Sequence, residues 1–280
     1  MELGVILRNT AADLTDITDD AALEARLIIQ KVTGLSRPVL LSHPERDISG
    51  PELEIINKMI NKRKTGFPLP YLLGEWEFYG HAFFVDPSVL IPRPETEMLV
   101  EEASGWLKRH PSVHMGFDIG TGSGCIAVSL LLEKPYLSMT AVDLHRNALM
   151  TACRNAARHN VRDRFCPVQS SLFSAFSQNV SLVIANLPYI PSRTCREIEP
   201  SRFEPLSALD GGDDGFDLYR LLFQQLSNKM NRECLILCEI EYRQRDLALM
   251  TTAEYFPDYR IDVLDDLAGL PRMLRIDHNE

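Results

Sequence analysis

Short apolar segments alternate with helical segments from about residue 115 onward, and this alternation constrains the fold more than any other feature. Strands alternating with helices form parallel sheets, because each helix carries the chain back to the edge where the previous strand began. We predict an α/β fold with a doubly wound, Rossmann-like sheet. The predicted strands lie near 115–119, 137–143, 165–169, 181–185 and 233–240, the helices near 123–133, 146–159 and 214–229, and a final hairpin joins Tyr259–Leu264 to Arg272–Asp277.

Residues 1–72 have a helical pattern and predict a separate small bundle of four or five helices. Asp19 or Asp20 can cap the first turn of one helix with its side chain. Ser49 and Glu52, three residues apart before an apolar run, predict a capping box at the start of another.

A linking β-hairpin is predicted within residues 73–90. The aromatic segments Glu75–Tyr79 and Ala82–Val85 flank Gly80-His81, which has the composition of a turn. The α/β domain would then occupy residues 91–280.

The charge of the chain argues against nucleic acid as a substrate. The net charge is −10, from 29 basic and 39 acidic residues, and neither half of the sequence is basic. An enzyme that binds duplex nucleic acid needs a face rich in Lys and Arg to neutralise phosphates. The composition is otherwise that of an ordinary globular protein, with 45% hydrophobic and 24% charged residues.

The six cysteines have no CxxC spacing and do not cluster with the seven histidines, so we expect neither a metal site nor disulfides. No apolar run approaches the roughly 18–20 residues that span a bilayer. The N-terminal sequence also lacks a basic segment followed by an apolar one. These features predict a cytoplasmic location and no membrane association.

A glycine-rich loop follows the first predicted strand and precedes a helix, which is typical of a cofactor site. Its backbone N–H groups can bind an anionic group of a ligand. The spacing is GxGxG rather than GxGxxG, so a dinucleotide is the weaker interpretation, and a plain turn is an alternative. Asp143 ends the next strand, where an acidic side chain can accept both ribose hydroxyls. The predicted cofactor residues in this loop are Gly120, Thr121, Gly122, Ser123 and Gly124.

The tetrapeptide Asn186-Leu187-Pro188-Tyr189 follows an apolar strand and predicts the reaction. An amide nitrogen is a poor nucleophile, and a site can help by accepting both of its N–H protons. The Asn186 side-chain carbonyl and the Leu187 backbone carbonyl can be those acceptors, while Pro188 restrains Leu187 and Tyr189 offers a flat face. Together with the glycine loop, this predicts methyl transfer from S-adenosylmethionine to a nitrogen, with Asn186 also a predicted cofactor-binding residue. An ordinary exit from a strand is the alternative.

The tetrapeptide resembles the Asn-Pro-Pro-Tyr motif of amino-methyltransferases, and residues from about 70 to 280 resemble the HemK/PrmC family, with residues 1–70 similar mainly in helical pattern and length. The resemblance implies a class I methyltransferase that modifies the glutamine N5 atom in the Gly-Gly-Gln motif of peptide chain release factors. It also implies S-adenosylmethionine as cofactor. Because the helical bundle and the hairpin precede a complete catalytic fold, we expect them to bind the protein substrate, and we expect the protein to be a monomer. The further segments that carry it are Gly74–Gly80, Leu90–Glu97, Asp118–Gly124, Arg202–Pro205, Asp210–Gly215 and Asp266–Gly269.

Two positions depart from the family pattern. Leu187 replaces the first proline of the motif but keeps the backbone carbonyl, so we expect activity to survive. Ser171-Leu172-Phe173 stands where the family commonly has Asp-Trp-Phe. The resemblance places adenine contacts there, so Leu172 would pack against the ring without an Asp to hydrogen-bond it.

Three other functions fit part of the pattern. An adenine N6-methyltransferase would use the same tetrapeptide but would need a basic groove and base flipping. A ribosomal-protein glutamine methyltransferase is closer, although Pro92–Glu97 favours release factors. A cofactor-binding protein without catalysis is disfavoured by the intact Asn186 and Tyr189.

Overall fold

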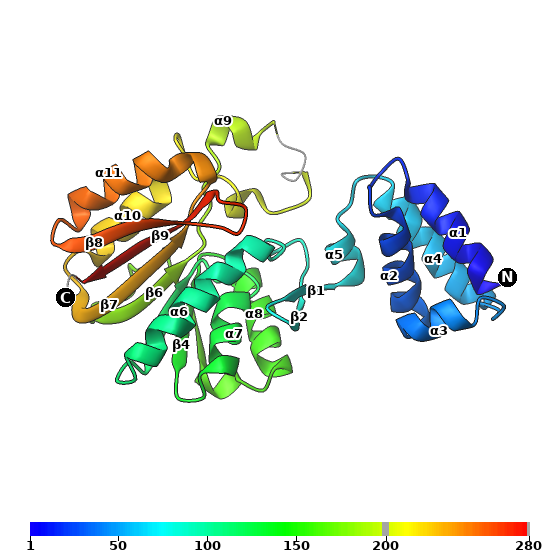
Figure 1. Cartoon of the computed structure of the whole chain (residues 1–280), viewed down its shortest axis with the longest axis horizontal. Coiled ribbons are helices and arrows are strands. Elements are labelled where there is room, and N and C mark those ends of the chain that lie inside the picture. Colours follow the sequence, from blue (N-terminus) through cyan, green and yellow to red (C-terminus); the bar gives the residue numbers. More distant parts are fainter. Residues whose placement is uncertain (198–201, 279–280) are drawn as a thin grey trace. The chain divides into compact units, whose positions relative to one another are not determined.

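The computed structural model describes residues 1–197 and 202–278. The chain forms two compact units, Met1–Glu75 and Trp76–Glu280 (Figure 1). Among the described residues, no helix is both long and apolar enough to cross a membrane.

The N-terminal unit is helical, as predicted. Its helices are α1 (Leu3–Leu14), α2 (Ala21–Thr33), α3 (Arg37–Ser42), α4 (Gly50–Arg63) and α5 (Leu69–Leu73). The capping box of Ser49 and Glu52 is confirmed at the start of α4. The predicted Asp20 cap is wrong, because only its backbone carbonyl, not its side chain, accepts the first-turn N–H groups of α2.

The predicted hairpin consists of β1 (Glu75–Phe78) and β2 (His81–Phe84), which form a two-stranded sheet. Its turn is Tyr79-Gly80 rather than Gly80-His81, and both turn residues have positive φ. A two-residue turn matches the twist of its strands when both residues have this conformation. Phe78 and Phe83 are buried in the core of the larger unit.

The larger unit contains a seven-stranded sheet of order β5-β4-β3-β6-β7-β9-β8. The first five strands in this order are parallel, and β9 runs antiparallel between β7 and β8. The predicted α/β class and the final hairpin are confirmed. The strands are β3 (Met115–Ile119), β4 (Ser138–Asp143), β5 (Phe165–Gln169), β6 (Val180–Ala185), β7 (Met230–Glu239), β8 (Tyr259–Asp265) and β9 (Pro271–His278).

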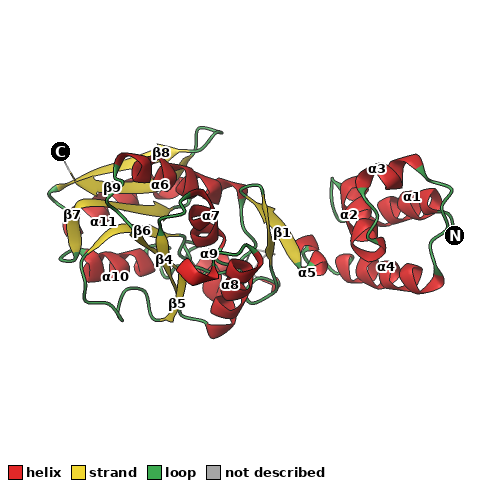
Figure 2. Ribbon diagram, turned by 90° about the horizontal axis from the view of Figure 1, so that it is seen from below, coloured by secondary structure: helices red, strands yellow, loops and turns green. Residues whose placement is uncertain are grey.

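Helices cover both faces of this sheet, with α6, α7 and α8 on one face and α10 and α11 on the other (Figures 1 and 2). Successive residues of a strand face opposite sides. Leu182 and Ile184 of β6 therefore pack under the first group, whereas Val183 and Ala185 pack under the second. The helices are α6 (Glu97–Arg109), α7 (Cys125–Glu133), α8 (Arg146–Arg158), α9 (Ser192–Cys195), α10 (Asp217–Leu226) and α11 (Arg245–Tyr255).

The helix predicted at 214–229 is α10, which is shorter at both ends. Gly212 and Gly215 have positive φ just before it, so the chain forms a loop there instead of a first helical turn. A Cβ at Gly215 would lie 2.2 Å from the Tyr189 carbonyl oxygen. The loop thus brings backbone close to the tetrapeptide that follows β6, at a distance that only glycine allows.

Candidate functional site

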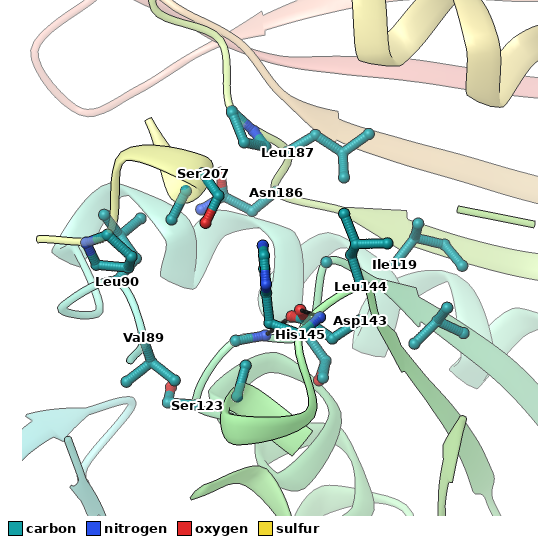
Figure 3. A pocket seen from close by; sticks show the side chains of 18 of the residues that line it. Val89, Leu90, Ile119, Ser123, Asp143, Leu144, His145, Asn186, Leu187 and Ser207 are labelled. Atoms are coloured by element: carbon teal, nitrogen blue, oxygen red, sulfur yellow. Dashed lines mark hydrogen bonds between the residues drawn. The ribbon is translucent and has the colours of Figure 1, made fainter. Parts of the chain in front are cut away.

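The carboxyl ends of β3, β4 and β6 meet at one edge of the sheet, where parallel doubly wound sheets place their ligands. A cavity at this edge is lined by the loop after β3, by Asp143 at the end of β4 and by Asn186 after β6. Figure 3 shows the side chains of Val89, Leu90, Asp143 and Asn186 around it. Segments far apart in the sequence therefore form one site.

The structure brings nearly all of the predicted site residues to this cavity. Gly124 and Tyr189 are the exceptions. Gly124 is the N-cap of α7, and a Cβ there would lie 3.0 Å from that of Ala152. Tyr189 lines a smaller adjoining cavity. The predicted residues that line the main cavity are Gly120, Thr121, Gly122, Ser123, Asp143, Leu172, Asn186, Leu187 and Pro188.

The glycine loop is held close to β4 and to the tetrapeptide. The backbone N–H groups of Gly120 and Thr121 both donate to the Val142 carbonyl, at 2.8 and 2.9 Å. A Cβ at Gly120 would lie 2.9 Å from Cδ2 of Leu187. Positive φ values at Gly120 and Gly122 complete a turn that a side chain would strain and obstruct.

Asp143 is oriented by the backbone on either side of it. Its Oδ2 accepts from the Gly122 N–H at 3.0 Å, and its Oδ1 accepts from the His145 N–H at 2.8 Å. Each carboxylate oxygen can accept a further hydrogen bond. The carboxylate can therefore receive the two hydroxyls of a ribose while it holds the glycine loop in place.

Asp118, in β3, is a buried acid that the sequence prediction passed over. Its Oδ2 accepts from the Thr121 hydroxyl at 2.7 Å and from the Ala127 N–H at 3.3 Å. Its Oδ1 is buried and has no hydrogen-bond partner among the described residues. Burial raises the pKa of Asp118 to about 7. Its position at the end of a buried strand, directly before the glycine loop, could have identified Asp118 as a candidate site residue.

Replacing Asp118 by asparagine should stabilise the ligand-free protein at pH 8, by about 2–4 kcal/mol. The pKa of Asp118 is raised from 3.8 to about 7, so its contribution to stability is complete below about pH 4 and is lost as the pH rises to about 7. Asparagine has the shape of the protonated acid and does not ionise. Chemical denaturation of both proteins between pH 4 and pH 8 measures the difference. Parallel stability curves would contradict the shifted pKa.

Asn186 is held in one orientation by its amide nitrogen. Nδ2 donates to the Thr96 hydroxyl at 3.1 Å and to Oε2 of Glu239 at 3.0 Å. Within the described residues, neither Oδ1 of Asn186 nor the backbone oxygen of Leu187 has a hydrogen-bond partner. Two carbonyl oxygens from adjacent residues are therefore free to accept hydrogen bonds from a ligand.

Leu187 has a contact that the sequence prediction did not include. Its backbone N–H donates to Oη of Tyr219 at 3.2 Å, and that hydroxyl donates to the Glu239 backbone carbonyl at 2.5 Å. Tyr219 is fully buried and so joins the exit of β6 to the end of β7. A proline at position 187 would have no N–H for this bond.

The backbone after the tetrapeptide is fixed by the glycine-rich loop before α10. Ile190 exchanges backbone hydrogen bonds with this loop, accepting from Gly211 at 2.8 Å and donating to Leu209 at 3.0 Å. A Cβ at Gly211 would lie 2.6 Å from the Pro188 carbonyl oxygen. The Asp210–Gly215 segment is therefore a backbone support for the site.

The wall formed by residues 88–96 is fastened by Glu204, another residue that the site prediction left out. Its carboxylate accepts from the Ile91 N–H at 3.0 Å and pairs with Arg93 at 2.6 Å.

Leu172 lines the same cavity with φ of +51°, an uncommon conformation for leucine. Polar and apolar groups together thus enclose the ligand space.

A smaller cavity adjoins the main one at Asn186. It is lined by Leu90, Arg93, Asn186 and Tyr189, together with Ile190, Ala208 and Leu209. Leu90, Arg93, Asn186 and Ala208 line both cavities. Two ligands, one in each cavity, would meet at the Asn186 side chain.

This fold and this arrangement of residues are those of a methyltransferase. Residues 6–74 match the PrmC N-terminal domain and residues 96–197 match the methyltransferase small domain. The release factor glutamine methyltransferase of Geobacter sulfurreducens is 36% identical over 234 residues, covering 82% of this chain and 81% of that protein. The one of Nitratidesulfovibrio vulgaris is 36% identical over 261 residues, covering 91% and 88%.

The chain belongs to the release factor glutamine methyltransferase family. Methyltransferases in general use S-adenosylmethionine as methyl donor. The crystal structure of a ribosomal protein L11 methylase from Lactobacillus delbrueckii subsp. bulgaricus has a TM-score of 0.51 and 20% identity. That similarity covers 70% of this chain and 84% of the other, and it shows the fold alone.

Proposed function

We propose that this protein transfers a methyl group from S-adenosylmethionine to the side-chain nitrogen N5 of the glutamine in the Gly-Gly-Gln motif of peptide chain release factors. The observation that carries the proposal is the orientation of Asn186. Its amide nitrogen is occupied by Thr96 and Glu239, so its carbonyl oxygen is free where the two cavities meet. The names of the family's other members support the same substrate.

The main cavity has groups suited to S-adenosylmethionine, which supplies an electrophilic methyl group on a sulfonium centre. Asp143 would accept the ribose hydroxyls, and the tight turn of the glycine loop would let the methionine moiety approach its backbone closely. Leu172 would pack against the adenine. Asp118 lies buried beneath this loop, where it would hold Thr121 in place by accepting from its hydroxyl.

The smaller cavity would take the glutamine side chain. Oδ1 of Asn186 and the Leu187 carbonyl would accept its two N–H protons, which fixes the nitrogen and directs its lone pair away from them. Tyr189 would lie against the planar amide. The proton can leave after the methyl has been transferred, so the chain's own residues need to orient the amide rather than deprotonate it.

The helical N-terminal unit is proposed to bind the release factor. The hairpin within 73–90 is proposed to link it to the catalytic domain predicted at 91–280, and the hairpin side chains Phe78 and Phe83 are buried in the core of the larger unit. The match of residues 6–74 to the PrmC N-terminal domain supports this division of roles. We propose that the protein acts in the cytoplasm, because release factors act on ribosomes there, and that it acts as a monomer.

Transfer of labelled methyl groups to three substrate classes tests the proposal. Intact release factor should be labelled, and a release factor whose motif glutamine is replaced by alanine should not. Ribosomal protein and adenine-containing DNA should remain unlabelled under the same conditions. Labelling of either in preference to the release factor would replace the proposal with one of the alternative substrates.

Replacing Asp143 by alanine should weaken S-adenosylmethionine binding by about 10- to 100-fold. The ribose hydroxyls would lose a charged acceptor worth roughly 1.5–3 kcal/mol. The Gly122 and His145 N–H groups would also lose their partner, which loosens the loop. Titration calorimetry measures the affinity, with Asp143→Asn as the variant of matched shape. An unchanged affinity in the alanine variant would show that Asp143 does not bind the ribose.

A further inference from the structure

Glu239 is a buried acid at the end of β7, with 2% of its surface exposed. Three side chains donate to its carboxylate. Oε2 accepts from the Thr96 hydroxyl at 2.6 Å and from the Asn186 amide at 3.0 Å, and Oε1 accepts from the Tyr189 hydroxyl at 3.1 Å. Its carboxylate therefore links two residues of the tetrapeptide to Thr96, just before α6.

The geometry points to Glu239 as the positioning residue that selects which end of the Asn186 amide faces the substrate. This inference rests on the proposed function, in which the free Oδ1 of Asn186 accepts a proton of the glutamine amide. The two ends of an asparagine amide have nearly the same shape but opposite hydrogen-bonding roles. Something in the site must therefore distinguish them.

A turned amide would place Oδ1 of Asn186 against a carboxylate oxygen that can only accept. It would also present N–H donors to the N–H donors of the substrate. The Thr96 hydroxyl reinforces the observed orientation, because it donates to Glu239 and accepts from Asn186 at 3.1 Å. Within this triangle Asn186 only donates, Oε2 of Glu239 only accepts, and the Thr96 hydroxyl does both, so the three hydrogen bonds favour the same amide orientation.

The protonation of Glu239 does not change this selection. Burial raises the pKa of Glu239, and the Tyr189 hydroxyl can reverse to accept a proton placed on Oε1. Oε2 remains the acceptor for Asn186 in both states. Glutamine at position 239 would reproduce the protonated arrangement, with its amide oxygen toward Asn186 and its nitrogen toward Tyr189.

The test compares Glu239→Gln with Glu239→Leu on the full chain. We expect the glutamine variant to keep its single-turnover methylation rate within several-fold of the parent. The leucine variant should be slowed roughly 10²-fold, while its affinity for S-adenosylmethionine changes little. Adding Asn186→Ala to Glu239→Leu should slow the reaction no further than Asn186→Ala alone, because the acid acts through the asparagine.

Glu133→Leu is the matched control. The Glu133 carboxylate also accepts from a tyrosine and a serine hydroxyl, those of Tyr79 and Ser104, but it does not line the cavity. Its variant should methylate at the parent rate. If Glu239→Leu fails to bind cofactor, Thr96→Val is tested in its place. We expect its methylation rate to fall by about 2- to 10-fold while its affinity for S-adenosylmethionine stays unchanged.

Either of two results would overturn the inference while the proposed function stands. One is a folded Glu239→Leu or Thr96→Val variant with the parent rate on release factor. The other is a double variant whose loss equals the product of the single losses. Absence of methylation by the parent chain would reject the proposed function, and the inference with it.

Discussion

Replacing Asn186 by alanine is expected to slow methyl transfer by roughly 10²- to 10³-fold while S-adenosylmethionine still binds with near-parent affinity. The substrate amide would lose the acceptor that fixes its nitrogen, whereas Asp143 and the glycine loop would remain in place. The loss should therefore appear in the single-turnover rate and not in the affinity for either substrate. Rapid-quench kinetics with intact release factor, together with cofactor titration, measures both quantities.

Two further variants control this prediction. Asn186→Asp should also be slow, because a second carboxylate would face that of Glu239 where the Asn186 amide now donates at 3.0 Å. Leu187→Pro keeps the backbone carbonyl but loses the N–H that donates to Tyr219, so it should cost about 1 kcal/mol of stability and little rate. A near-parent rate for Asn186→Ala with a collapsed rate for Leu187→Pro would contradict the amide clamp.

Deleting residues 1–74 is expected to abolish methylation of the intact release factor and to leave cofactor binding unchanged. Every described residue that lines the cavity belongs to the larger unit, and the hairpin side chains Phe78 and Phe83 are buried in that unit's core. The truncated chain therefore begins at Glu75, which retains the hairpin. Calorimetry with S-adenosylmethionine and a methylation assay on release factor measure the two outcomes.

A short peptide that contains Gly-Gly-Gln is the control for this deletion. The peptide lacks the surfaces that the N-terminal unit would bind, so the full and truncated chains should methylate it at similarly low rates. Full activity of a folded truncated chain on the intact release factor would show that the N-terminal unit does not bind the substrate.

The elements that position the cofactor loop could be predicted because their signals are local. The spacing of Gly120, Gly122 and Gly124 after an apolar strand predicts a turn into a helix, and the structure has that turn. The helix start predicted near residue 214 was wrong, because the conformation of Gly212 and Gly215 depends on a distant segment of backbone. The insertion of β9 between β7 and β8 likewise depends on pairing that no local pattern records.

The supporting residues of the site could not be predicted for a similar reason. Glu239 lies at the end of a buried apolar strand, and its partners Thr96, Asn186 and Tyr189 are between 50 and 143 positions away in the sequence. Tyr219 fits the apolar face of its helix, so its hydroxyl carries no signal of its own. Sequence patterns predicted the residues that would contact ligands. The residues that hold those side chains in place depend on contacts between segments far apart in the sequence, which no local pattern records.

Mass spectrometric mapping of the methylated release factor tests the central claim most directly. After incubation with the full chain and S-adenosylmethionine, the peptide that contains Gly-Gly-Gln should gain one methyl group, and fragmentation should place it on the glutamine side-chain nitrogen. Heat-inactivated enzyme should give the unmodified peptide. A methyl group on any other residue, or an unmodified Gly-Gly-Gln peptide after incubation with folded, cofactor-binding enzyme, would contradict the proposed function.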